Sequence, residues 1–257
     1  MSDGPRVALV VPCYNEARRL DRDAFAEALA ASPWLDLIFV NDGSTDGTVG
    51  LLHALRDQWP TRVEVLSLER NAGKAEAVRQ GLMRALAHEG VCGFWDADLS
   101  APLDEVPGLR TVLAEHPQVE WAWGIRLRAL GREVTRRPVR HYLGRLFATV
   151  SSLLLAIDSY DTQCGAKLFR VSPLLRAVLA EPFRSRWIFD VELLSRADAL
   201  LRCGGTRTLS QVVYEQPLAV WRHQPGSKLR SGDFVKALRE LLVVRSARRR
   251  WYRAGVP

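Results

Sequence analysis

Two aspartates, Asp96 and Asp98, follow a short apolar run, residues 91–95 (VCGFW). Such a run predicts a buried strand. Alternate residues of an extended segment point to the same side, so the two carboxylates can converge. Paired carboxylates suit Mg²⁺ or Mn²⁺ held together with substrate phosphates, and such a metal would neutralise a leaving diphosphate. A DxD pair also occurs in solvated loops, so its meaning depends on the elements that position it.

Three other polar clusters also follow apolar runs. The first is PCYNE (12–16), the second NDGSTDG (41–47) and the third NAGK (71–74); the runs before them are VALVVP (7–12), LDLIFV (35–40) and residues 63–68. Ligands of an open parallel sheet bind at the carboxyl ends of its strands. Four successive strands are therefore expected to deliver polar side chains to one edge.

Helical spacing separates these strands. It predicts helices over residues 16–31, 48–59 and 74–88. The alternation of strands and helices predicts an α/β fold with a mostly parallel sheet covered by helices on both faces.

Asp42 has two interpretations. At the end of a buried strand its carboxylate could accept a hydrogen bond from a nucleotide base, or it could cap the following turn and helix. No GxGxxG follows the first strand and no GxxxxGK[ST] is present, so a dinucleotide-binding or P-loop site is not supported.

The chain of 257 residues has a net charge of +7, and this charge is uneven. Residues 126–145 carry +6 and residues 222–253 carry +8, so the remainder carries −7. Two basic segments on an otherwise acidic chain predict a surface for an anionic partner. The sequence has no zinc-finger spacing and no RNA-recognition signature, so we expect no nucleic-acid partner.

The second half of the chain has a different pattern. Residues 142–157 are strongly apolar but interrupted by Arg145, and they are shorter than the ~20 residues of a membrane span. Helices are expected at 173–180 and 189–201, a strand at 206–214, and a basic helix at 233–252. We expect one domain over 1–232, with a nucleotide-binding half (1–125) and an acceptor-binding half (126–232) that contains an amphipathic segment at 140–157. A basic C-terminal helix (233–257) would follow it.

Taken together, VPCYNE, NDGSTDGT, NAGKAEAVRQG and DAD resemble the family 2 glycosyltransferases with the GT-A fold. The later segments DTQCGAKLFR (161–170), RWIFDVELL (186–194) and GSK (226–228) resemble the dolichyl-phosphate glucosyltransferase branch and its bacterial relatives. The resemblance covers about residues 7–230.

The resemblance implies a role for each matching position. Asp96 and Asp98 would hold Mg²⁺ or Mn²⁺, and Asp190 and Lys228 would be catalytic. The nucleotide sugar would contact Pro12, Tyr14, Glu16, Val40, Asp42, Lys74, Asp96, Ala97, Asp98, Arg222 and Lys228. The acceptor phosphate would contact Arg126, Arg137, Arg140 and Gln163.

The implied reaction is an inverting transfer, with UDP-glucose as the expected donor and a polyprenyl or dolichyl phosphate as the acceptor. A phosphate acceptor is already anionic and needs no base, whereas a hydroxyl acceptor would need one, for which Asp190 is the candidate. The expected location is cytoplasmic and peripheral, at the inner face of the membrane. The basic, aromatic C-terminal residues Arg245, Arg248, Arg249, Arg250, Trp251 and Tyr252 would contact anionic lipids.

Some positions depart from the family pattern. Asn41 stands where many relatives have a second Asp, and Ser100 stands where mannosyl-transferring relatives often have Gln. His223 follows Trp221-Arg222 where an acidic residue would be expected nearby. Three alternatives stay open: a glycosyltransferase with a soluble acceptor, a sugar nucleotidyltransferase, and an inactive nucleotide-sugar-binding module.

Overall fold

The computed structural model describes residues 4–88, 90–134, 157–205, 207–224 and 233–254. Its centre is a seven-stranded sheet with the strand order β3-β2-β1-β4-β7-β5-β8. The strands are β1 (Val7–Cys13), β2 (Leu35–Asn41), β3 (Val63–Ser67), β4 (Val91–Trp95), β5 (Trp121–Ile125), β7 (Ala166–Arg170) and β8 (Val213–Pro217). Strands β6 (Glu133–Val134) and β9 (Val220–Trp221) form a separate two-stranded ribbon.

Most strand pairs of the large sheet are parallel. β1 pairs in parallel with both β2 and β4, and β5 pairs in parallel with β8. β7 is the exception, because it runs antiparallel to both β4 and β5. The predicted α/β class and mostly parallel sheet are therefore confirmed, and β7 marks the point where the second half of the sheet begins.

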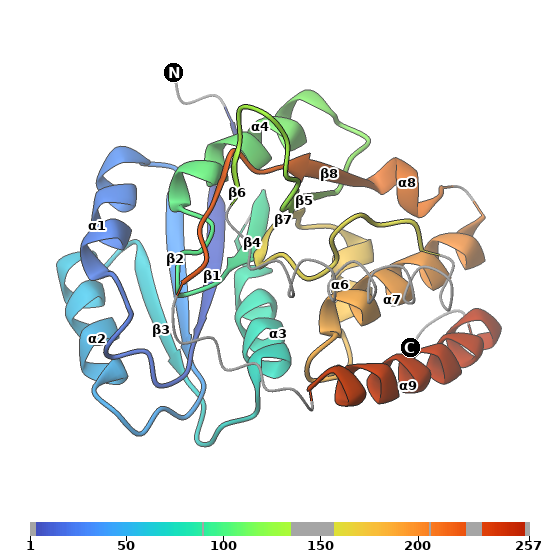
Figure 1. The fold of residues 1–257 in the computed structure, drawn as a ribbon, viewed down its shortest axis with the longest axis horizontal. Helices are drawn as coiled ribbons and strands as arrows, with labels where there is room; N and C mark the ends of the chain where they lie inside the picture. The colour runs from blue at the N-terminus through green and yellow to red at the C-terminus, as the bar shows by residue number, and fades with distance from the viewer. Residues whose placement is uncertain (1–3, 89, 135–156, 206, 225–232, 255–257) are drawn as a thin grey trace.

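Helices cover both faces of the sheet (Figure 1). One face carries α1 (Arg22–Ala31), α2 (Thr48–Gln58) and α4 (Val106–Glu115), the last preceded by the short helix η1 (Leu103–Glu105). The other face carries α3 (Lys74–Ala85), α6 (Pro173–Leu179) and α7 (Phe189–Gly204), and α9 (Asp233–Ala254) packs on α7. The strands β1, β2, β4 and β5 between these layers are almost entirely buried, as expected for a sheet covered on both faces.

Several element bounds differ from the sequence expectation, most clearly those of the first helix and of the strand expected at 206–214. The first helix begins at Arg22 rather than at residue 16, because residues 14–20 form a loop and Asp21 caps the helix by accepting from the Ala24 amide. The expected strand at 206–214 is also wrong. A short helix, α8 (Leu209–Val212), occupies its middle, with a capping box formed by Thr208 and Gln211, and β8 begins only at Val213.

The apolar 142–157 segment lies outside the described residues except at its last position, as do Arg137, Arg140 and Lys228. In the part of the chain that is described, no helix combines the length and the apolarity needed to cross a bilayer.

Candidate active site

The ends of β1, β2, β3 and β4 lie at one edge of the sheet. The backbone register aligns Cys13 with Asn41, and Asn41 with Ser67, so three strands end side by side. β4 continues this row as the other neighbour of β1. The polar loops that follow all four strands therefore start from the same edge, as the sequence predicted.

The loop after β1 is bonded to the loop after β2. The Asn15 amide donates to Ser44 Oγ at 3.0 Å, and the Thr45 amide donates back to Asn15 Oδ1 at 2.9 Å. Asn15 adopts a left-handed backbone conformation, with φ of 52°, which Asn tolerates better than most residues. This loop places Pro12 and Tyr14 at the partly exposed edge, while Glu16 is buried and ion-paired with Arg19 at 2.6 Å.

Asp42 organises the loop before α3. Its carboxylate accepts from the backbone amides of Ala72 (2.7 Å) and Gly73 (2.9 Å) and from the side-chain amide of Asn71 (2.9 Å). Burial raises the pKa of Asp42, although these amide donors work in the opposite direction. Asp42 and the adjacent Val40 are both buried. Asp42 therefore caps neither the turn nor the helix that directly follows it, and its carboxylate binds the 71–73 loop instead.

Asp96 lies against the first residue of α3. Its Oδ1 is 2.5 Å from Lys74 Nζ, and both side chains are partly exposed. Desolvation lowers the pKa of Lys74, but the carboxylates of Asp96 and Asp190 outweigh it, so this pKa lies above its ordinary value. The Asp96 carboxyl also lies directly on Gly165, whose backbone carbonyl accepts from the Asp96 amide at 3.0 Å.

Asp98 is held by the turn that follows it. Its Oδ1 accepts from the Ser100 amide at 3.0 Å, and Ala97 between the two aspartates is buried. Asp98, like Asp96, is partly exposed. Two such carboxylates fit Mg²⁺ or Mn²⁺, which takes one or two carboxylates and completes its shell with water and substrate phosphates. Within the described residues, no group of three or more His, Cys, Asp or Glu side chains forms an all-protein metal site.

A buried ion pair lies beside these groups. Lys167 Nζ is 2.8 Å from Asp190 Oδ1, and the two side chains are almost inaccessible to solvent. The ammonium also stands over the rings of Phe94 (5.0 Å) and Trp123 (4.5 Å) and donates to the Cys164 carbonyl. Burial raises the pKa of Asp190, although Lys167 and Lys74 lower it. Asp190 is therefore a buried, partnered carboxylate rather than an open one.

A second pair occupies the start of the other half. Arg126 binds Asp161 through two bonds of 2.6 Å, a bidentate geometry, and its backbone amide donates to the same carboxylate at 3.1 Å. Next to Asp161, the buried atoms Thr162 Oγ1 and Gln163 Nε2 have no hydrogen-bond partner. The guanidinium of Arg126 is therefore already paired with a carboxylate, whereas Thr162 Oγ1 and Gln163 Nε2 are polar atoms that could bind a ligand.

The side chain and the backbone of Arg222 have different partners. The guanidinium forms an exposed ion pair with Glu133 at 2.9 Å, whereas the backbone amide donates to the Ser100 carbonyl at 2.7 Å. The β6–β9 ribbon therefore lies next to the Asp98 turn.

Three residues that contact the predicted site residues were not themselves predicted from the sequence as contacts. Asp161 as the partner of Arg126, Lys167 as the partner of Asp190, and Gly165 under Asp96 all belong to the segment 161–170. The signal that could have found Lys167 is the scarcity of lysine. The chain has only four, and Lys74, Lys167 and Lys228 all fall in motif segments.

Comparison with known proteins assigns this site to a family. The family model "Glycosyl transferase family 2" matches residues 8–176, which contain the four strand-end loops and the 161–170 segment. The chain belongs to glycosyl transferase family 2. It is a glycosyltransferase, and the family resemblance of its motifs is confirmed.

Two curated relatives that this chain resembles over most of its length have the same name as each other. The dolichyl-phosphate β-glucosyltransferase of Saccharomyces cerevisiae is 28% identical, covering 94% of this chain and 74% of that protein. The Drosophila melanogaster protein of the same name is 33% identical, covering 78% and 65% respectively.

Solved structures support the fold. Glucosyl-3-phosphoglycerate synthase of Mycobacterium tuberculosis aligns with a TM-score of 0.65 at 20% identity, covering 99% of this chain and 82% of that one. The same protein in complex with Mn²⁺, UDP-glucose and phosphoglyceric acid aligns with a TM-score of 0.63, covering 95% and 80%.

Proposed function

We propose that this glycosyltransferase moves glucose from UDP-glucose to a polyprenyl phosphate, with inversion and with Mg²⁺ or Mn²⁺ as cofactor. The observation that carries the proposal is that Asp42, Asp96 and Asp98 follow β2 and β4, the two strands that flank β1, in a chain that resembles two dolichyl-phosphate β-glucosyltransferases. The β product in those names supports inversion, because a single displacement on an α-linked donor gives a β linkage.

Asp96 and Asp98 would hold the metal, which when bound neutralises the departing diphosphate. Lys74 would add a positive charge beside it, since it already contacts Asp96. Asp42 fixes the 71–73 loop and so supports Lys74, the first residue after that loop. Arg222 and Lys228 are proposed donor-phosphate contacts.

The environment of Asp190 favours an anionic acceptor. A general base needs access to the proton it removes, but Asp190 is buried and ion-paired with Lys167. A phosphate acceptor needs no such base, and Arg126 with Gln163 would orient it, together with Arg137 and Arg140. Because a polyprenyl acceptor lies in a membrane, we also propose that the enzyme works peripherally, at the cytoplasmic face.

The test is incubation of the purified enzyme with a panel of UDP- and GDP-sugars, undecaprenyl or dolichyl phosphate, and Mg²⁺ or Mn²⁺. We expect a glucosyl phospholipid in the organic phase by mass spectrometry, UDP as the other product, and loss of both with a chelator. Asp98→Ala should lower the rate by about 10³-fold. Asp57→Ala, which removes an exposed carboxylate at the end of α2, is the control.

Two other outcomes would contradict the proposal. A product confined to the aqueous phase would indicate a soluble acceptor, and release of pyrophosphate in place of UDP would indicate a nucleotidyltransferase.

A further inference from the structure

One face of helix α9 is buried against the rest of the protein. Leu241, Val244, Ala247 and Trp251 are buried in the core that α9 shares with α7. Arg248 is also buried and lies 2.5 Å from Asp198 of α7. The expectation that Arg248 and Trp251 contact lipid is therefore wrong. Both side chains lie on the face of α9 that packs against α7.

The other face of α9 combines exposed apolar and basic side chains. Leu238, Leu242 and Val243 are 38%, 55% and 45% exposed, and Lys236, Arg239 and Arg245 between and beside them are exposed as well. Residues three and four apart are neighbours on a helix, so Leu238 and Leu242 lie between the basic side chains. Glu240 is the one acidic residue from 234 to 254.

The carboxylate of Glu240 binds the backbone just before α7. Its Oε2 accepts from the amides of Trp187 (2.9 Å) and Ile188 (3.2 Å), at the start of α7. Trp187 is exposed, and a groove of about 420 Å³ lies between this loop and α9, lined by Arg186, Trp187, Lys236, Arg239 and Glu240. The apolar and basic surface of α9 therefore continues onto the 186–187 loop.

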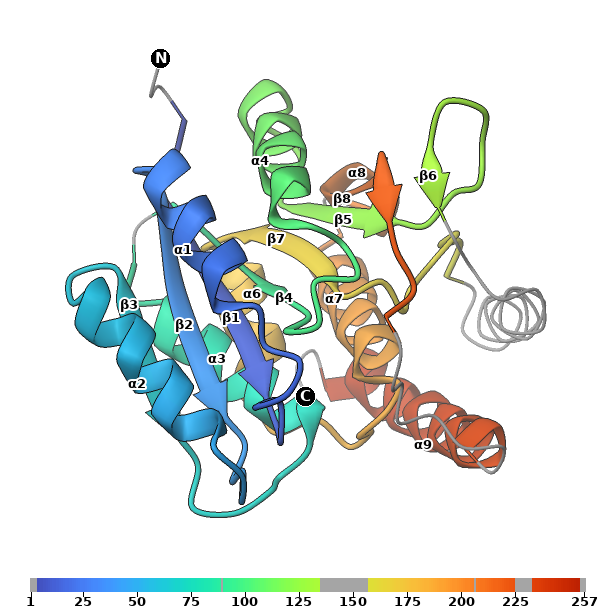
Figure 2. The same ribbon diagram turned by 60° about the vertical axis from the view of Figure 1, so that its left-hand side comes forward.

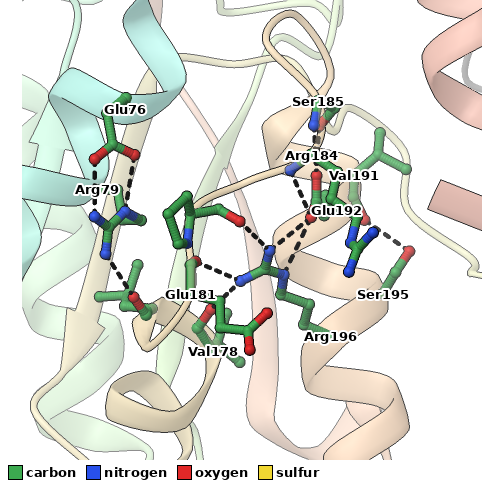
Figure 3. A network of polar contacts seen from close by, with 12 residues as sticks. Glu76, Arg79, Val178, Glu181, Arg184, Ser185, Val191, Glu192, Ser195 and Arg196 are labelled. Atoms are coloured by element: carbon green, nitrogen blue, oxygen red, sulfur yellow. Dashed lines mark hydrogen bonds and ion pairs between the residues drawn. The ribbon is translucent and has the colours of Figure 1, made fainter. Parts of the chain in front are cut away.

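A buried network binds the backbone that leads into that loop. Arg196 of α7 pairs with Glu192 at 2.7 Å and donates to the carbonyls of Val178, Glu181 and Pro182 (Figure 3). Glu192 in turn accepts from the amides of Arg184 and Ser185. Trp187 follows this network by two residues, and its own amide is held by Glu240 of α9.

This surface lies at the functional end of the molecule. Figure 2 shows α9 at the same end as the arrowheads of β1 and β2, where the candidate site begins. A direct contact joins the two regions, because Arg186 Nη2 donates to the Ala72 carbonyl at 3.2 Å, in the loop that Asp42 holds.

We propose that the outer face of α9, with Arg186 and Trp187, is the surface by which this enzyme docks on an anionic lipid bilayer. The inference rests on the proposed lipid acceptor. Leucine, valine and tryptophan would enter the headgroup boundary, and the basic side chains would pair with lipid phosphates. An α9 lying in the interface holds the strand-end site beside the membrane, where the phosphate of a lipid acceptor lies.

The test is co-sedimentation with vesicles of phosphatidylglycerol and phosphatidylcholine, using two double variants. Arg239→Gln with Arg245→Gln should weaken binding to anionic vesicles by about 25-fold, since each basic residue contributes about fivefold. Leu238→Ser with Leu242→Ser should weaken it about tenfold or more.

Matched controls remove the same groups elsewhere. Arg56→Gln with Arg84→Gln removes two surface charges from the last turns of α2 and α3, at the opposite end of the sheet. Met83→Ser with Leu130→Ser removes two other exposed apolar side chains, which are 41% and 104% exposed. Both controls should bind vesicles as the unmodified protein does.

A second assay separates this inference from the proposed function. With a short-chain, water-soluble prenyl phosphate, the α9 variants should turn over as fast as the unmodified enzyme, whereas with acceptor in vesicles they should be slower. Vesicle binding without any prenyl-phosphate transfer would leave the docking surface intact and refute the acceptor. Equal vesicle binding by all variants would overturn the docking surface. It would also be overturned if light scattering showed that the α9 variants lose self-association while their lipid binding is unchanged.

Discussion

At the scale of single residues, the site depends on a position with no side chain. A Cβ at Gly165 would overlap the carboxyl of Asp96, and the Gly165 backbone carbonyl already fixes the Asp96 amide. The DxD pair therefore owes its placement to β4 and to the 161–170 segment beside it. Asp96 also touches Lys74, so three separate segments meet at one carboxylate.

Gly165→Ala should displace the Asp96 carboxylate without unfolding the protein. We expect kcat/KM to fall by about 100-fold, because small displacements of catalytic groups have effects of this size. Steady-state kinetics with far-ultraviolet circular dichroism would measure both properties. Gly108→Ala on α4, where a Cβ meets nothing within 4 Å, is the control. Unchanged kinetics in Gly165→Ala would show that the position of Asp96 is not critical.

At the scale of elements, α3 is pressed against the strands that carry the site. A Cβ at Gly81 would overlap the side chain of Val10 on β1 and come within 2.8 Å of Val40 on β2. This close approach sets the distance between the second half of α3 and the strands β1 and β2. Gly50 of α2 is a helical glycine with open space around it, so the two positions differ only in packing.

Alanine at these two glycines should have opposite effects. Gly81→Ala should lower the free energy of unfolding by about 1–3 kcal/mol through overpacking. Gly50→Ala should raise it by about 0.5–1 kcal/mol, because alanine is the better helix former. Urea unfolding followed by circular dichroism measures both. A stabilised Gly81→Ala variant would mean that α3 can move away from the sheet at little cost.

The second prediction at this scale concerns the loop between α6 and α7, which the Glu192–Arg196 ion pair holds (Figure 3). Arg196→Met leaves Glu192 buried without its partner and should cost about 3–5 kcal/mol. The double variant Glu192→Gln with Arg196→Met should be more stable than the single one, because no buried charge remains. If the two variants unfold at the same urea concentration, packing rather than charge holds this loop.

At the scale of the whole molecule, the cationic and anionic groups of the site are already paired with one another. Lys74 contacts Asp96, Lys167 contacts Asp190, and Arg126 contacts Asp161. Binding of a metal and a diphosphate to such a site must rearrange part of this pairing.

Metal and UDP together should raise the melting temperature of the protein. Ligand at 100 times its Kd adds about 2.7 kcal/mol, which corresponds to about 5–10 °C for a domain of this size. Differential scanning fluorimetry with UDP, Mn²⁺ and both would measure it. We expect UDP alone to give a smaller shift, and Asp98→Ala to lose the contribution of Mn²⁺. A shift with UDP that is unaffected by a chelator would argue against the metal site.

The sequence by itself determined the fold class and the edge at which the site forms. Alternating apolar runs and helical spacings fix which segments can be buried strands, and the polar residues after each run must then lie at the strand ends. The positions of Asp42, Asp96, Asp98 and Lys74 could be predicted in this way, because each lies within three residues of a strand end or begins a helix.

Only the tertiary structure decided which charged groups pair and which faces stay exposed. Asp161 with Arg126, and Lys167 with Asp190, meet because β7 is inserted between β4 and β5, a pairing that local sequence patterns do not encode. The same is true of α9. Its spacing shows that it has two faces, but its packing on α7 decides that Arg248 and Trp251 are buried and that Leu238, Leu242 and Arg245 face solvent.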